Sequence, residues 1–549
     1  MSTPGRPARL TEISGLAVAI FGIIAFAYLT VPAIDSDYGW HVANGRHLLD
    51  GQLFAGLDTY SWTARGATWI AHEWLTEGVM AFLHDSIGPT ANSLLAGALG
   101  AAAILLTVAR LRARGFGVAI ALMVGLLALL DAGTIVSVRP LVVEVFAVAF
   151  LLWLIDRWRA GGVQTRPFAA AVLIGFLIWA NAHGSFVLGL GIMGAAWVGL
   201  VAERNPRARS LGLLGLGAAL MTLANPFGVR VYAYVLSAVT GSRLNLIAEW
   251  APPDVATSMW WAFSVALALA ALAGLGTLAG LAGPGTLAGP SRFRRRSPSA
   301  RDGGPGSSQN PRRVRLDDAL IAGALGFMGL QHAYHAGLFG IAAAPAIAAG
   351  IATIVHAGRL RIGFNRHARE GGVSATQTRK RVNLVLLAFV ALLGASLVWA
   401  RVGPSNTEAA MQSEYPVAAL PALDELAAAL PGGLCLFNDY SWGGWIEMVR
   451  PEIPVFIDGR SEVYGDEHVA RYAAISGGGP ESAEALAATG ANAALIPKSS
   501  DLAGTLARTA AWTTDYSDDH AVLLVFASSE IVPGSAAGSG ADSAPCLPR

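Results

Sequence analysis

Long runs of apolar residues recur along most of this 549-residue chain and set the first expectation about its fold. Each run approaches the roughly 20 residues that a helix needs to cross about 30 Å of hydrocarbon. The pattern predicts a polytopic α-helical membrane protein with about 11 transmembrane helices. The predicted spans cover residues 13–33, 90–108, 116–134, 140–156, 168–183, 186–202, 210–226, 258–281, 318–335, 337–355 and 382–400.

Composition supports the membrane class. The chain is 54% hydrophobic and 14% charged, with a mean hydropathy of +0.50, whereas a soluble protein carries about 25% charged residues. The net charge of +1 gives no reason to expect a nucleic-acid partner. The run 13–33 is too long for a removed signal peptide and lacks a small-residue cleavage site, so we expect a retained helix.

Basic residues fall on alternate connections between the predicted spans. If each run crosses once, all of these arginine-rich segments lie on the same side of the membrane. The positive-inside rule then places the N-terminus in the cytoplasm and the chain after residue 400 outside. The basic segments are residues 6–9, 110–114, 157–166, 203–210, 291–315 and 359–381.

Three regions outside the spans differ in character. Within the predicted transmembrane domain 1–402, residues 34–88 form a long outer loop, and the helical spacing of apolar residues in 68–88 predicts an interfacial amphipathic helix. Residues 284–317 are rich in Gly, Ser, Pro and Arg, which predicts a disordered cytoplasmic linker. After residue 402 the composition becomes that of a soluble protein.

This C-terminal region, residues 403–530, predicts a small extracytoplasmic α/β domain followed by a disordered tail, 531–549. Helical stretches at 420–431 and 481–490 alternate with short strand-like runs. The two cysteines, Cys435 and Cys546, allow one disulfide in such a compartment. The strand-like runs are 434–438, 454–459, 493–497 and 521–526.

Strongly polar residues gather at the predicted outer face of the membrane. Ionisable groups at or within spans are costly and by default mark a functional site. Asp35 and Asp37 directly follow the first run, and a purely solvated loop end explains this pair less well than a functional site does. Others also have structural interpretations, as helix boundaries before proline, turn histidines or an aromatic belt. The further candidates are His41, His72, Glu73, Trp74, Arg139, Asn181, His183, Asn225, Arg230, Glu249, His332 and His335.

Carboxylates, arginines and a lipid-accessible bundle at one face suit a polyprenyl-phosphate-linked sugar donor. Its phosphate needs cationic partners, for which Arg139, Arg230 and His332 are candidates, and the loop His72–Trp74 would close the cleft. Transfer to a hydroxyl acceptor with inversion needs one carboxylate as general base.

The predicted outer domain has a cluster of its own in NDYSWGGWIE (438–447) and FIDGRSEVYGDEH (456–468). Its glycines suggest tight turns after strands, where α/β folds usually bind ligands. Asp439, Asp458 and Arg460 would then line an acceptor site. Turn chemistry and a buried Asp–Arg pair explain the same residues equally well.

An acidic pair directly after the first span, on a chain of about eleven spans with a C-terminal outer domain, resembles the GT-C superfamily of membrane glycosyltransferases. Its members include protein O-mannosyltransferases, aminoarabinose transferases and oligosaccharyltransferase catalytic subunits. More closely, the chain is similar to uncharacterised bacterial GT-C-like membrane proteins. The residues that carry this resemblance are DSDYGWHVANGRHLL (35–49), AHEWL (71–75), WANAHGSF (179–186), ANPFGVRVY (224–232), FNDYSWGGW (437–445) and VFIDGR (455–460).

This resemblance implies transfer of a sugar from a polyprenyl-phosphate donor to an extracytoplasmic glycan, lipid or protein in a bacterial inner (plasma) membrane. Asp35 or Asp37 would be the base, and both would be ligands if a divalent ion such as Mg²⁺ or Mn²⁺ is used. Their Asp-Ser-Asp spacing departs from the adjacent acidic pair of several GT-C enzymes, so the acting carboxylate stays open. A non-catalytic GT-C-like scaffold or a lipid-linked-sugar transporter is the alternative, although transporters usually show internal repeats and midplane sites.

Overall fold

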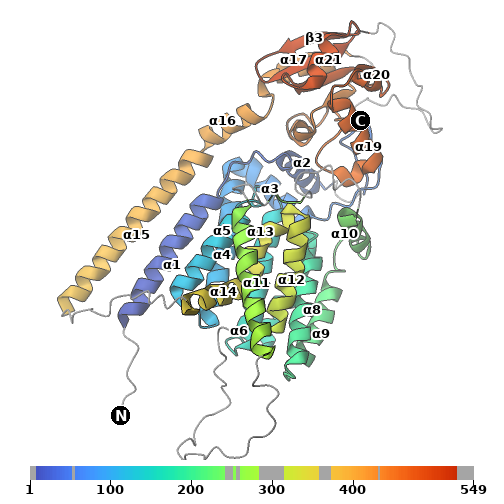
Figure 1. Ribbon diagram of the computed structural model, residues 1–549. Coiled ribbons are helices and arrows are strands. Elements are labelled where there is room, and N and C mark those ends of the chain that lie inside the picture. The colour runs from blue at the N-terminus through green and yellow to red at the C-terminus, as the bar shows by residue number, and fades with distance from the viewer. Residues whose placement is uncertain are drawn as a thin grey trace, which may run out of the picture.

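The computed structural model describes residues 8–51, 56–240, 252–254, 260–282, 314–357, 373–430 and 433–527. Long helices lie side by side in a bundle, and a C-terminal domain with a small sheet sits above one end of it (Figure 1). Two short helices, α2 (Tyr38–Leu49) and α3 (Trp74–Ser86), lie between the bundle and this domain. They belong to the first outer loop, residues 34–88, whose place outside the membrane is a prediction.

Every predicted span coincides with a helix, except that the tenth is broken. Residues 337–355 fall on α13 (Ala333–Ala342) and α14 (Ala344–Ala357), which are bent by 65° at their junction. The other bundle helices are α1 (Ala8–Leu29), α4 (Pro89–Ala113), α5 (Val118–Ala132), α6 (Leu141–Arg159), α7 (Thr165–Ala182), α8 (Phe186–Ala202), α9 (Ala208–Met221), α11 (Trp261–Ala282), α12 (Leu316–Gln331) and α15 (Val373–Val402).

Fewer helices satisfy a strict length-and-hydropathy test for crossing a bilayer. Among the described residues, Pro89–Ala113, Thr165–Ala182 and Lys380–Glu414 pass by length and composition, and the bent pair α13–α14 would make a fourth. Several others are apolar but shorter than 18 residues. The chain is thus a helical membrane protein, and the count of eleven spans stays a prediction.

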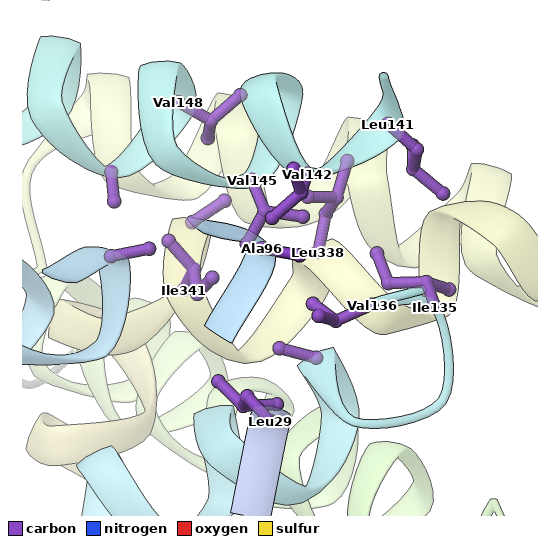
Figure 2. Packing of buried hydrophobic residues seen from close by; sticks show 14 of the residues in the cluster. Leu29, Ala96, Ile135, Val136, Leu141, Val142, Val145, Val148, Leu338 and Ile341 are labelled. Carbon is purple, nitrogen blue, oxygen red and sulfur yellow. The ribbon is translucent and has the colours of Figure 1, made fainter. Parts of the chain in front are cut away.

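The centre of the bundle packs α6 against α4 and α13, and α4 against α1. Figure 2 shows Val142, Val145 and Val148 of α6 beside Leu338 and Ile341 of α13. These side chains are at most 5% exposed. Small residues on α13 let it approach α5 closely, since a Cβ at Gly340 would lie 2.7 Å from the backbone of Ala128. The packing of α6 holds its N-terminal end in place, and this end contributes Leu141 and Glu144 to the cavity described below.

At the other end of α4, a buried ion-pair network joins α4, α6 and α12. Arg110 Nε and Arg114 Nε each lie 2.7 Å from Asp156 Oδ2, and Arg114 Nη1 lies 2.5 Å from Asp318 Oδ2. Each buried guanidinium is thus paired with a carboxylate, as burial of charged groups requires. Residues 314–317 lay in the predicted disordered linker, but α12 already begins at Leu316 and so anchors to this network.

The first outer loop is more ordered than the sequence pattern predicts. Helix α3 occupies the predicted interfacial helix, but α2, immediately after the acidic pair, was not predicted. Gly39 and Gly45 lie on α2 where neighbours come very close: a Cβ there would lie 2.2 Å from the carbonyl oxygen of Gly444 and 2.0 Å from that of Glu77. The short helix α10 (Arg230–Thr240) lies farther along the same end of the bundle.

The C-terminal domain contains a four-stranded mixed sheet in the order β1-β2-β4-β3. Strands β1 (Leu436–Asn438) and β2 (Ala493–Pro497) are parallel, and β4 (Ala521–Phe526) pairs antiparallel with both β2 and β3 (Trp512–Ser517). Strand β3 was not predicted, whereas the predicted strand 454–459 makes only one bridge, Val455 to Ser61. The helices of this region are α16 (Pro404–Glu414), α17 (Leu420–Ala429), α18 (Gly443–Val449), α19 (Ser461–Ser476), α20 (Ser482–Ala487) and α21 (Asp501–Ala507).

Cys435, just before β1, is disulfide-bonded. Cys546, Glu249, the tail 531–549 and most of the predicted linker 284–317 lie outside the described residues.

Candidate functional site

A cavity of about 970 Å³ opens where the loop 34–88, the neighbouring ends of the bundle helices and the C-terminal domain meet. Its polar part combines residues far apart in the sequence, and its lower part is apolar. Eight residues that the sequence singled out line it: Asp37, His41, His72, Glu73, Arg139, His183, His332 and His335.

The acidic pair and an arginine form one edge of this cavity. Asp37 Oδ2 lies 3.2 Å from Arg139 Nη1, and Asp35 Oδ2 lies 3.7 Å from Arg139 Nε. The backbone N–H of Asp37 donates to Asp35 Oδ1 at 3.0 Å, the turn that Asx residues favour. Trp40 Nε1 donates to Asp37 Oδ1, and the Tyr415 hydroxyl donates to the Asp35 carbonyl. Asp37 lines the cavity, while Asp35 lies behind it.

A cluster of histidines surrounds Glu73, the residue that precedes α3. Glu73 Oε1 lies 3.1 Å from His183 Nε2 and 3.6 Å from His72 Nε2. Its other oxygen lies 3.8 Å from His41 Nδ1. Burial raises the pKa of Glu73 well above its usual range and lowers the pKa of His72 to about 4. Both groups therefore favour their uncharged forms when no further charge enters the cavity.

Glu144, one turn into α6, also lines the cavity, although it was not among the predicted site residues. It is buried, accepts a hydrogen bond from the Tyr334 hydroxyl, and lies 3.8 Å from His183 Nδ1. Tyr334, His332 and His335 bring the start of α13 to the same wall. The sequence did hold a signal for Glu144, because an acidic residue within a predicted span (140–156) is by default a candidate for a functional site.

The C-terminal domain supplies the wall opposite the bundle. Tyr440, Gly459, Ser461 and Glu462 line the cavity. The Tyr234 hydroxyl of α10 donates to Glu462 Oε1, which ties this wall to the membrane domain. Burial raises the pKa of Glu462. Glu462 directly follows the DGRS segment that drew attention in the sequence.

Below the polar chamber the cavity continues as an apolar groove between α8 and α12. Its lining follows helical spacing on both helices, so one face of each helix forms the groove. It reaches from the interior to the outer surface of the bundle, since Ile192 is 2% exposed and Val187 is 40% exposed. The groove residues are Val187, Leu188, Gly191, Ile192 and Ala195 on α8, and Leu320, Ile321, Ala324, Leu325 and Met328 on α12.

Other predicted site residues lie elsewhere. Trp74, Asn181 and Asn225 line a separate pocket of about 370 Å³, where Trp74 Nε1 donates to Asn181 Oδ1 at 3.0 Å. This contact fastens α3 to α7. Arg230 is exposed at the start of α10 and does not line the main cavity.

Of the predicted acceptor residues, Asp458 and Arg460 form a buried ion-pair centre. Arg460 Nη2 lies 2.5 Å from Asp458 Oδ2, and Arg460 Nη1 lies 2.9 Å from Asp58 Oδ1 in the first outer loop. Arg460 also stacks over Tyr60 and Trp69. Asp439 accepts from the backbone of Ser441, as in a turn. Arg460 and its partners thus hold the outer domain against the first loop.

These elements define a helical membrane protein with a polar chamber at one end of the bundle, an apolar groove leading from it, and the C-terminal domain over it. No family model and no curated protein matches the chain.

Solved structures do resemble it. The archaeal oligosaccharyltransferase AglB from Archaeoglobus fulgidus, in complex with an inhibitory peptide and a dolichol-phosphate, is similar over 89% of this chain and 70% of its own, with 10% identity and a TM-score of 0.52. ArnT from Cupriavidus metallidurans is similar over 93% of this chain and 98% of its own in the apo state, and over 96% and 99% when bound to undecaprenyl phosphate. Both comparisons show 13% identity, with TM-scores of 0.46 and 0.43. The chain has a GT-C-like fold.

Proposed function

We propose that this protein is a membrane glycosyltransferase that transfers a sugar from a polyprenyl-phosphate donor to an acceptor outside the membrane. The single observation that carries the proposal is the continuity of the cavity. One space joins a chamber with a carboxylate and an arginine to an apolar groove that opens on the side of the bundle. A ligand with a charged head and a long apolar tail is the kind of molecule that suits both parts.

The phosphate of such a donor would contact Arg139 and His332. Arg139 lines the chamber close to the top of α6, and a guanidinium is well suited to bind phosphate oxygens. In AglB, the similar structure, a dolichol-phosphate is bound. The tail would follow the groove between α8 and α12, where apolar side chains and lipid replace water.

Asp37 is our choice for the general base. Both carboxylates lie near Arg139, but Asp37 lines the cavity, whereas Asp35 does not and accepts a hydrogen bond from the backbone of the same loop. Asp37 would accept the proton of the acceptor hydroxyl as the oxygen attacks the anomeric carbon from the face opposite the phosphate. The bond from that carbon to the phosphate oxygen breaks, and the polyprenyl phosphate leaves as an anion. Asp35 would be a positioning residue.

A non-catalytic scaffold or a lipid-linked-sugar transporter is the second candidate. The polar residues favour the enzyme, because they gather at the outer face under a domain rather than at the bundle midplane, where transporter sites usually lie. The bent pair α13–α14 is the feature that a transporter would share.

The test incubates the purified full-length protein with a panel of radiolabelled polyprenyl-phosphate sugars and a membrane extract as acceptor source. We expect release of polyprenyl phosphate by the wild type, a loss of at least about 100-fold for Asp37→Asn, as removal of a general base costs, and a smaller loss for Asp35→Asn. Equal turnover by the wild type and both variants would refute the catalytic assignment. Saturable donor binding without any turnover would favour the scaffold or transporter.

A further inference from the structure

Helices α2 and α3 bring three metal-ligating side chains together beside the polar chamber. The helices are closest at Gly45, where any Cβ would meet the backbone of Glu77. His41 lies one turn earlier on α2. Glu73 and Glu77 are one turn apart at the start of α3, so both carboxylates face the His41 ring.

The distances suit a common ion. His41 Nδ1 lies 3.0 Å from Glu77 Oε1 and 3.8 Å from Glu73 Oε2, and one donor atom from each residue falls within 4.8 Å of the other two. Ligands on a tetrahedral ion with bonds of about 2.1 Å are about 3.4 Å apart. The three atoms could therefore close on an ion through small side-chain movements.

Each carboxylate is also held from behind. Asn44 Nδ2 donates to Glu77 Oε2, and His183 Nε2 lies 3.1 Å from Glu73 Oε1. Outer partners of this kind orient ligands in metal sites. The side chains of His41, Glu73 and Glu77 are 2%, 10% and 1% exposed, so water contributes little to screening the two carboxylates from one another.

The side chains that line the chamber also suit a bound cation. The acidic side chains that line the cavity are Asp37, Glu73, Glu144 and Glu462, whereas Arg139 is the one arginine or lysine among the described lining residues. Carboxyl groups therefore outnumber guanidinium groups on this wall. A cation near Glu73 would favour the charged forms of these carboxyl groups and would be balanced by them.

We propose that His41, Glu73 and Glu77 bind a divalent transition-metal ion with the chemistry of Zn²⁺. One imidazole and two carboxylates form a mixed N/O ligand set that suits such ions. His41 and Glu73 also line the cavity, so a fourth position would face the chamber. Asp35 and Asp37, the ligands expected from the sequence, are engaged by Arg139 instead. The inference goes beyond the proposed transfer reaction and is tested without it.

The experiment measures Zn²⁺ bound to the full-length protein in nanodiscs by equilibrium dialysis and elemental analysis. We expect about one high-affinity Zn²⁺ per wild-type chain. Glu77→Gln and Glu73→Gln should each weaken Zn²⁺ binding by more than about 100-fold, because changing a residue that only orients a ligand already weakens metal binding about 10–100-fold. Glu462→Gln, a matched change at a buried carboxylate of the same cavity, and Asp37→Asn should keep the wild-type affinity.

Size-exclusion profiles and thermal unfolding separate loss of the ion from loss of the fold. If Glu77→Gln does not fold, Glu73→Gln and the visible spectrum of bound Co²⁺ in the wild type carry the test, because tetrahedral Co²⁺ has an intense spectrum. Three results would overturn the proposal: no bound ion in folded wild type, unchanged affinity in both folded glutamine variants, or loss confined to Asp37→Asn.

Discussion

Replacing Arg460 with methionine tests how the outer domain is held over the cavity. The guanidinium is fully buried and is shared by Asp58, Asp458 and Glu447, with Nη1 2.9 Å from Asp58 and Nη2 2.5 Å from Asp458 and 3.2 Å from Glu447. Removing one partner of a buried ion pair costs about 3–5 kcal/mol, because the other charges stay buried. At about 1.4 kcal/mol per tenfold, the equilibrium constant for opening this contact should rise by roughly two to four orders of magnitude.

Hydrogen exchange of two backbone amides reports this opening directly. Val455 N–H donates to the carbonyl of Tyr60 and Trp62 N–H donates to that of Val455, both at 3.1 Å, so the two bonds bridge the first loop and the outer domain. We expect both amides to lose protection in Arg460→Met in the full-length protein. Equal exchange in the variant and the wild type would refute the reasoning.

The matched control is Arg450→Met. Arg450 pairs with Asp424 in the same domain, but the two side chains are 28% and 43% exposed. Exposed pairs contribute about 1 kcal/mol or less. The control should therefore change exchange at Val455 and Trp62 by less than tenfold.

Two further changes test the groove and the smaller pocket. Gly191→Phe should weaken donor binding at least tenfold, because a side chain there projects into space that the tail would occupy. Gly194→Phe lies on the same helix but outside the cavity lining, so it should leave donor binding unchanged. Equal effects of the two changes in a donor-binding titration would contradict the proposed tail site. Trp74→Phe removes the hydrogen bond to Asn181, so it should lower the free energy of unfolding by about 1 kcal/mol and leave donor affinity unchanged. A loss of donor affinity without a loss of stability would show that Trp74 contacts the donor.

The hydrophobic pattern was enough to predict the helical bundle, since spans must satisfy their backbone within one helix. The GT-C-like fold was expected from the resemblance of the acidic pair and the other motifs to that superfamily. It also indicated which end carries the polar residues: Asp37, Arg139 and His332 line one cavity although the chain separates them by about 300 residues. The break at Ala343 between α13 and α14 was not visible, because apolar residues continue through it.

The site itself depended on tertiary contacts that periodicity does not encode. Glu77 looked like one polar position of an amphipathic helix, yet packing at Gly45 places it against His41. Arg230 lies in the motif ANPFGVRVY (224–232), but of the helix that begins there Tyr234, and not Arg230, lines the cavity. Strand β3 begins with the buried Trp512 and continues with largely exposed polar residues, so it carried no apolar run.

In the proposed complex, a polyprenyl phosphate lies with its head at Arg139 and its tail between α8 and α12. Its most direct test is photo-crosslinking of a polyprenyl phosphate with a diazirine in its tail to the full-length protein in nanodiscs, followed by peptide mapping. We predict labelling within residues 187–195 and 320–328 that excess unlabelled lipid abolishes and Arg139→Gln reduces. Labelling spread over exposed apolar residues of α15 such as Leu384 and Leu392, insensitive to the competitor, would contradict the account.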